Sequence, residues 1–170
     1  WDVGKAAKDW PQLNFVIYHG ALRPFQEDPK DALAEFEQTG RIKWATDLAE
    51  IPAKFGVNNV YAEIGTSFAN SAVAHPKFSA ALLGTLIKGF GAERVLWGTD
   101  SVWYGSPQWQ IEALRRLEIP DDMQKKYGFV LGPWNFDGYH GRGHQTSGCC
   151  CVKLRHHRCR RGSCSAPVSP

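Results

Sequence analysis

The sequence predicts an α/β fold made of three parallel β/α units. Three short apolar runs, residues 13–18, 59–64 and 94–98, lack the alternation of polar and apolar residues that marks a strand with one solvated face. Such runs are typical of parallel strands buried on both faces. Stretches of tens of residues with helical periodicity separate them, as crossovers between parallel strands require.

The first unit begins with the end of a helix. Residues 2–10 show helical spacing of apolar side chains, and Pro11 is expected to stop this helix before the first strand, residues 13–18. Asp28 followed by Pro29 is a helix-start signal, and Gly40 is the corresponding stop. We therefore expect a helix over residues 29–39.

A second helix is expected over residues 42–55, with Pro52 kinking or shortening it. Its spacing predicts four inward-facing side chains, namely Trp44, Leu48, Ile51 and Phe55. The second strand, residues 59–64, follows.

The third unit starts from the most regular helical pattern in the chain. Large apolar residues recur every fourth position before Gly91, at Phe78, Leu82, Leu86 and Phe90. The third strand, residues 94–98, comes next, then a helix over about residues 107–117 and a short helical segment over residues 121–127.

Residues 131–170 have a different composition. All five cysteines lie in the last 22 residues, and no acidic residue follows Asp137. The first 137 residues carry 14 basic and 17 acidic side chains, so the overall charge of +3 belongs to the tail. This segment has no core-facing stripe, and we expect it to be an irregular, disordered Cys- and Arg-rich tail. Out-of-frame translation is one hypothesis for its origin.

The tail admits a rival interpretation as a zinc module or a basic nucleic-acid-binding arm. Its cysteines fit no paired C-x-x-C spacing, and no aromatic residue for base stacking follows Tyr139. We therefore expect no nucleic-acid partner. No apolar run approaches the roughly 20 residues that span a bilayer, so no membrane partner is expected, and a cysteine-free body suits the reducing cytoplasm.

Chemistry in parallel β/α folds sits where strands end and loops begin. His19 follows the first strand, Glu63 to Thr66 end the second, and Asp100 follows the third. All three strand ends therefore carry polar or ionisable groups, and these are the positions where chemistry is expected.

Three segments around these strand ends resemble the amidohydrolase-related (amidohydrolase 2 type) family of metal-dependent hydrolases and decarboxylases. They are FVIYHGALRP, NVYAEIGTSFA and RVLWGTDSVWYGSPQWQIEAL. The resemblance covers about residues 1–129, and the Gly98-Thr99-Asp100 turn is its most specific part. It implies a partial (β/α)8 TIM barrel, about the last three β/α units.

The resemblance implies roles for two residues. Asp100 would bind the catalytic divalent metal, zinc being the first expectation, and accept a proton from the attacking water. His19 would stand beside the metal as an acid/base, because imidazole exchanges protons near neutral pH. The alternatives are that Asp100, with Thr99, only N-caps the next helix, and that His19 is a loop histidine bonded to backbone.

Four further residues are candidates for binding a small-molecule substrate. Glu63, inside an apolar strand, is expected to face the polar end of the barrel lumen or to pair with a cation. Arg23 could hold a substrate carboxylate, although an exposed loop arginine is the alternative. Trp103 and Tyr104 either line the substrate pocket or pack beneath the loop.

The metal site of the family also uses a His-x-His or Glu-x-His pair on the first barrel strand and a histidine on the fifth. No such pair precedes His19. The resemblance thus implies a fragment of a parent enzyme that hydrolyses C–N, C–O or C–C bonds or decarboxylates a small organic acid. A homo-oligomer is one expectation for that parent. The alternative is an inactive truncated product, and we expect the fragment not to retain the metal.

Overall fold

The computed structural model describes residues 2–22, 28–129 and 152–153. Its sheet has the order β1-β2-β3-β4, and the first three strands are parallel. This confirms the predicted α/β fold with parallel units. The strands are shorter than predicted, at Phe15–Ile17, Val60–Glu63 and Val95–Trp97, with β4 at Val152–Lys153.

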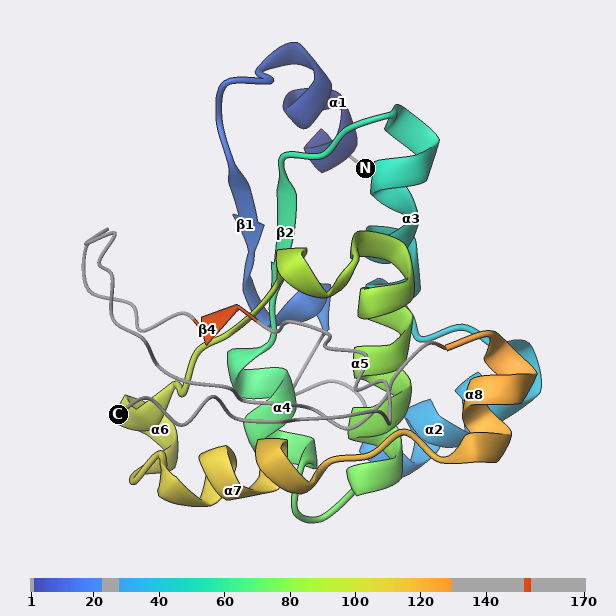
Figure 1. The fold of residues 1–170 in the computed structure, drawn as a ribbon, viewed down its shortest axis with the longest axis vertical. Coiled ribbons are helices and arrows are strands. Elements are labelled where there is room, and N and C mark those ends of the chain that lie inside the picture. The colour runs from blue at the N-terminus through green and yellow to red at the C-terminus, as the bar shows by residue number, and fades with distance from the viewer. Residues whose placement is uncertain (1, 23–27, 130–151, 154–170) are drawn as a thin grey trace, which may run out of the picture.

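Helices make up most of the remaining described chain (Figure 1). In chain order they are α1 (Asp2–Asp9), α2 (Pro29–Thr39), α3 (Ala45–Phe55), α4 (Gly65–Ser71), α5 (Pro76–Phe90), α6 (Ser101–Tyr104), α7 (Gln108–Arg116) and α8 (Asp121–Tyr127). Two 3₁₀ turns, η1 (Tyr18–Ala21) and η2 (Ala92–Arg94), adjoin the first and third strands.

The predicted helix ends are confirmed where the capping chemistry is strong. The Asp28 carboxylate accepts a hydrogen bond from Lys30 N at 2.8 Å, and Pro29 opens α2. Gly40 ends that helix with φ 72°, a left-handed conformation that glycine adopts without steric cost.

One expectation for α3 is wrong. Trp44 does not point inward: it precedes the helix with φ 63° and is 46% exposed. Pro52 does not shorten the helix, which continues to Phe55. Leu48 and Ile51 are buried, as predicted. The helices α4 and α6 were not predicted, because both are short and neither sequence shows an apolar stripe.

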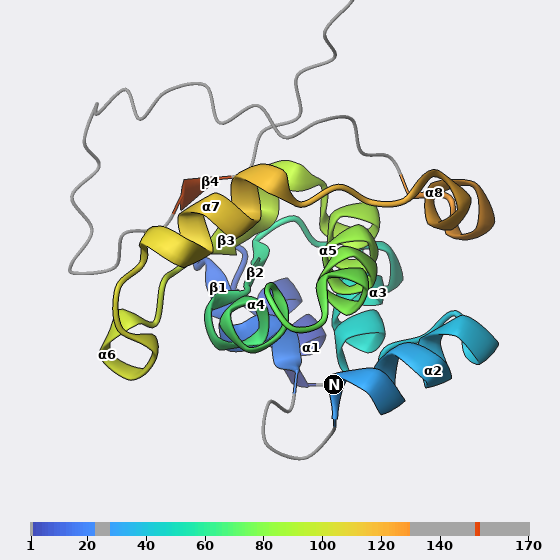
Figure 2. The ribbon, with the colours of Figure 1, turned by 90° about the horizontal axis from the view of Figure 1, so that it is seen from below.

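The core lies between the sheet and the helices α3 and α5, which stand side by side (Figure 2). Nearly the whole of α5 is buried. Its Gly89 lies against α3, where an added Cβ would come within 2.1 Å of the Ala49 carbonyl oxygen. Close approach of the two helices therefore depends on a glycine.

The outer edge of β1 differs from the rest of the sheet. Among the described residues β1 pairs only with β2, whereas the outer edge of β3 pairs with β4 in antiparallel orientation. Four large apolar side chains on and around β1 are exposed, namely Trp10, Leu13, Val16 and Tyr18. Such an edge can pair with another chain.

Most of the predicted tail, including all five cysteines, lies outside the described residues, as does Arg23. Only Val152 and Lys153 of the tail are described, as the short strand β4. Within the described part of the chain, no helix has both the length and the apolar character that crossing a membrane requires.

Candidate functional site

Three strand ends meet at one edge of the sheet and bring the predicted site residues together. His19 lies in η1 directly after β1, Glu63 ends β2, and Asp100 lies between β3 and α6. Because the three strands are parallel neighbours in chain order, their carboxyl ends share one edge. The structure thus brings three of the candidate residues together at this edge.

Glu63 forms the buried centre of this site. The residue is 5% exposed, and its carboxylate accepts backbone N–H groups from all three strand ends. Gly65 N lies 2.6 Å and Gly98 N 3.1 Å from Oε1, while His19 N lies 3.1 Å from Oε2. The carboxylate thus gains hydrogen bonds that offset its desolvation. Among the described Lys and Arg side chains, none forms an ion pair with it.

His19 is held in an unusual backbone conformation. Its φ is 60° and ψ 21°, and Gly20 and Ala21 also have positive φ. A non-glycine residue pays a steric cost there, so surrounding contacts must hold it. Besides the bond to Glu63, the His19 carbonyl accepts hydrogen bonds from Ser67 Oγ at 2.5 Å and from Leu22 N at 3.0 Å.

The His19 ring lies between two carboxylates. Its Nδ1 is 3.5 Å from Glu63 Oε2, and its Nε2 is 4.0 Å from Asp100 Oδ2. In a neutral ring that carries its proton on Nε2, the nitrogen nearer Asp100, Nδ1 accepts a 3.4 Å hydrogen bond from Thr66 N. The loop-histidine alternative is thus correct about a backbone bond, but that bond also orients the ring.

Asp100 does not cap α6. It precedes that helix with φ 48°, and its side chain makes no capping hydrogen bond. Its Oδ2 instead accepts a hydrogen bond from the Thr66 hydroxyl. Only the Thr99 part of the capping alternative is found, as a 3.3 Å bond from Ser101 N to Thr99 Oγ1.

The side chains of His19 and Asp100 are each about one-third exposed, at 31% and 32%. Solvent or a ligand can therefore reach both, whereas the Glu63 side chain, at 6%, is covered. A reachable imidazole beside a reachable carboxylate is suited to moving a proton to or from a bound molecule.

The described residues do not complete a metal site by themselves. No group of three or more His, Cys, Asp and Glu side chains that could hold a metal ion occurs among them. His19 and Asp100 would supply two donors, and zinc sites in enzymes use three protein ligands. These two residues could hold one side of such a site.

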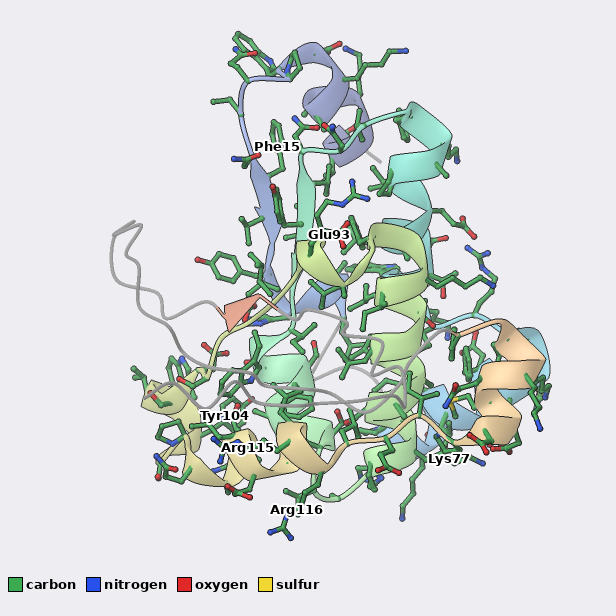
Figure 3. All side chains as sticks on the ribbon, viewed as in Figure 1. Phe15, Lys77, Glu93, Tyr104, Arg115 and Arg116 are labelled. Atoms are coloured by element: carbon green, nitrogen blue, oxygen red, sulfur yellow. The ribbon has the colours of Figure 1, made fainter. Side chains whose placement is uncertain are left out.

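The remaining candidates lie apart from this cluster or beyond the described residues. Trp103 is 81% exposed, so it does not pack beneath the loop. Tyr104 lies at the end of α6 near α7, and its carbonyl accepts a 3.4 Å hydrogen bond from Trp109 Nε1 (Figure 3). Arg23 lies outside the described residues, so its proposed contact with a substrate stays a prediction.

Sequence reasoning missed several residues that build the site. Ser67 lies in α4, a helix that was not predicted, as does Gly65, which the range 63–66 had included. Gln110 is fully buried on α7, and its Nε2 donates to the Thr99 carbonyl at 2.6 Å, which ties α7 to the turn before Asp100. The glycines of the G-T-S and G-T-D segments were the available signal, because Gly98 directly follows β3 and Gly65 comes two residues after the end of β2.

Comparisons with known proteins add no family to this geometry: no protein-family model, no curated protein and no solved structure matches the chain.

Proposed function

We propose that this chain is the C-terminal part of a metal-dependent barrel enzyme of the amidohydrolase type. In this proposal β1, β2 and β3 are the last three strands of a (β/α)8 barrel. The sheet supports it, because the strands are parallel, adjacent in chain order and separated by helical crossovers. Unlike a doubly wound sheet, this arrangement shows no reversal of strand order within the described parallel strands.

The observation that carries the proposal is the convergence of His19, Glu63 and Asp100 at the carboxyl ends of the strands. Active sites of barrel enzymes lie at this edge. Here it holds a reachable imidazole 4.0 Å from a reachable carboxylate.

The proposed roles follow from exposure and bonding. Asp100, oriented by the Thr66 hydroxyl, would be a metal ligand, and His19 would move a proton at Nε2. A divalent metal, when bound, would lower the pKa of a water molecule enough to make it a nucleophile near neutral pH. The substrate class is a small molecule with a hydrolysable C–N, C–O or C–C bond, or a small organic acid that loses carbon dioxide.

The experiment compares two substitutions in the polypeptide that carries this segment together with the rest of the barrel. Asp100→Asn should lower metal content and turnover together, because a carboxylate supplies charge that the ion needs. His19→Asn should leave the metal bound and lower turnover about 10²- to 10⁴-fold, the usual contribution of acid–base catalysis.

Metal content by elemental analysis and turnover would be measured on the same preparations. A His19→Asn protein that loses its metal, alongside an Asp100→Asn protein that keeps metal and activity, would refute the assignment. So would coding sequence upstream that contains neither a His-x-His nor a Glu-x-His pair in frame.

A further inference from the structure

The Glu63 carboxylate bonds to backbone, and its bonds reach every segment that carries a candidate catalytic residue. We define the Glu63 clasp as this carboxylate together with the N–H groups of His19, Gly65 and Gly98. We propose that Glu63 is a positioning residue: it binds no substrate but locks the three strand ends in register and holds His19 in its left-handed conformation beside Asp100.

The distribution of the bonds supports this role. Oε1 receives the N–H groups that follow β2 and β3, at 2.6 Å and 3.1 Å, and Oε2 receives the N–H group that follows β1, at 3.1 Å. Hydrogen bonds to an ionised acceptor are stronger than neutral ones. One side chain therefore couples three segments that are up to 79 positions apart in sequence (Gly98 versus His19).

Two glycines make room for the carboxylate. A Cβ added at Gly65 would lie 2.6 Å from Glu63 Oε1, and one added at Gly98 would lie 2.9 Å from the same oxygen. Both distances are below normal van der Waals contact, so a larger residue would have to displace the carboxylate. The small residues at these two positions are thus explained by the clasp.

Burial separates Glu63 from the groups that a ligand can reach. Its side chain is 6% exposed, against 31% for His19 and 32% for Asp100. With its oxygens occupied by backbone donors and covered from solvent, Glu63 acts on a ligand through the positions of the strand ends that carry His19 and Asp100. This argues against the earlier expectation that Glu63 binds substrate.

The amino end of β2 offers a matched control. Asn59 is 6% exposed and lies four positions before Glu63, and its Nδ2 donates to the carbonyls of Ala7, Trp10 and Leu13. Asn59→Asp and Glu63→Gln are both isosteric exchanges of an amide and a carboxylate at a buried site with three backbone partners. Only the second exchange changes the clasp.

The test is native-state hydrogen exchange on the 170-residue chain, which requires no turnover. In Glu63→Gln the amides of His19, Gly65 and Gly98 should lose roughly ten- to a hundredfold more protection than the amides of Leu82 and Leu83 in α5, since a hydrogen bond to a charged group contributes about 1.5–3 kcal/mol. In Asn59→Asp, the three clasp amides should lose no more protection than the α5 amides.

Gly98→Ala is a second, milder variant in case Glu63→Gln does not fold. Its Cβ should displace the carboxylate and selectively expose the amides of His19 and Gly65, neither of which is mutated. Equal loss of protection in the clasp and in α5, or no loss in the clasp, would overturn the proposal. The inference rests on the proposed function, because it explains how His19 is placed beside Asp100. The hydrogen-exchange test does not depend on catalysis, so the positioning role can fail while the proposed function holds, and the reverse.

Discussion

Two regions of the molecule are held together in different ways. We call the helices α2, α3, α5 and α8 the helical layer, and the cluster of His19, Glu63 and Asp100 the strand-end site. In the helical layer, α5 is buried along almost its whole length by apolar side chains on regular backbone. At the strand ends, by contrast, lie three of the four described non-glycine residues with positive φ, which are His19, Ala21 and Asp100. Polar bonds hold His19 and Asp100, whereas Ala21 packs against the apolar core.

The helical layer therefore supplies the stability of the fold, whereas the strand-end site fixes the positions of particular side chains. A helix buried by apolar side chains gains free energy from area, and many sequences supply that area. A backbone in the left-handed region costs free energy and persists only where specific bonds fix it. The strand-end site is therefore where the chain gives up stability for a defined arrangement of His19 and Asp100.

The largest expected effect lies in the helical layer. Phe36 is fully buried, with its ring centroid 4.3 Å from that of Tyr127 and 6.1 Å from that of Phe129. Phe36→Ala should lower the free energy of unfolding by about 3–5 kcal/mol, because it removes transfer free energy and leaves a cavity. Urea denaturation measures this loss.

Val73→Ala is the control, because Val73 is 69% exposed and its loss should change the free energy of unfolding by less than about 0.5 kcal/mol. If Phe36→Ala also costs less than that, the aromatic cluster of Phe36, Tyr127 and Phe129 is not packed as described.

The second expected effect lies in the site itself. Thr66→Val keeps the shape of the side chain and removes the hydroxyl that donates to Asp100 Oδ2. Because the carboxylate is one-third exposed and water can replace the donor, the loss in stability should be only about 1 kcal/mol. Thr85→Val, at a buried position on α5, is the matched control.

Thr66→Val should change the local structure around Asp100 more than it changes the free energy of unfolding. In Thr66→Val the Asp100 carboxylate should change rotamer, seen as chemical-shift changes at residues 99–101, while Thr85→Val should leave these shifts unchanged. Unchanged shifts in both variants would show that the Thr66 hydroxyl does not orient Asp100.

The sequence predicted the helical layer better than the site, and particular residues show why. Asp28, Gly40 and Gly91 mark helix ends by local chemistry, and these ends are where the structure has them. Phe78, Leu82, Leu86 and Phe90 are buried as their spacing predicted. Helix-end residues and the spacing of apolar residues each involve only a few neighbouring positions, so a single sequence is enough to detect them.

The strand-end residues could be predicted, but their bonds could not. That His19, Glu63 and Asp100 follow apolar runs is visible in the sequence. That Glu63 accepts N–H groups from residues 44 positions before it and 35 positions after it is not. Trp44 was misplaced for a related reason: helical spacing placed it inward, but the helix begins one residue later, at Ala45.

The third prediction concerns the outer edge of β1, which pairs with no other strand among the described residues. Residues 10–18 contain no charged side chain that would oppose pairing with a second chain. We expect the 170-residue chain to self-associate, and Val16→Lys, at a residue that is 41% exposed, should weaken association roughly tenfold. Analytical ultracentrifugation measures this change.

The control for the edge is Val102→Lys, because Val102 is 91% exposed on α6, away from β1. Equal weakening by both variants would indicate a general effect of added charge rather than pairing at β1. A chain that is already monomeric would show that the edge of β1 is covered.

The smallest expected effect is an ionic one on the surface of the helical layer. Arg41 hydrogen-bonds Glu50 at 2.6 Å and Asp47 at 2.7 Å, and its guanidinium lowers the pKa of the Glu50 carboxyl below the ordinary value of 4.5. Because the folded-state pKa is the lower one, the unfolded chain binds more protons in this range. The contribution of the pair is therefore complete above about pH 4.5 and is lost as the pH falls through the folded-state pKa.

Glu50→Gln removes this pH dependence, and the size of the effect is limited by solvent. The Glu50 side chain is 50% exposed, so the difference in free energy of unfolding between the two proteins should stay below about 1 kcal/mol at neutral pH. It should shrink further as the pH falls below about 4.5, because the wild-type carboxylate then becomes protonated. Glu93→Gln, at a side chain that is 68% exposed and 3.9 Å from Arg94, is the control and should show a smaller difference throughout. Urea denaturation of the three proteins across this range measures both quantities, and a Glu50→Gln difference that grows as the pH falls would mean that Arg41 does not stabilise the charged carboxylate.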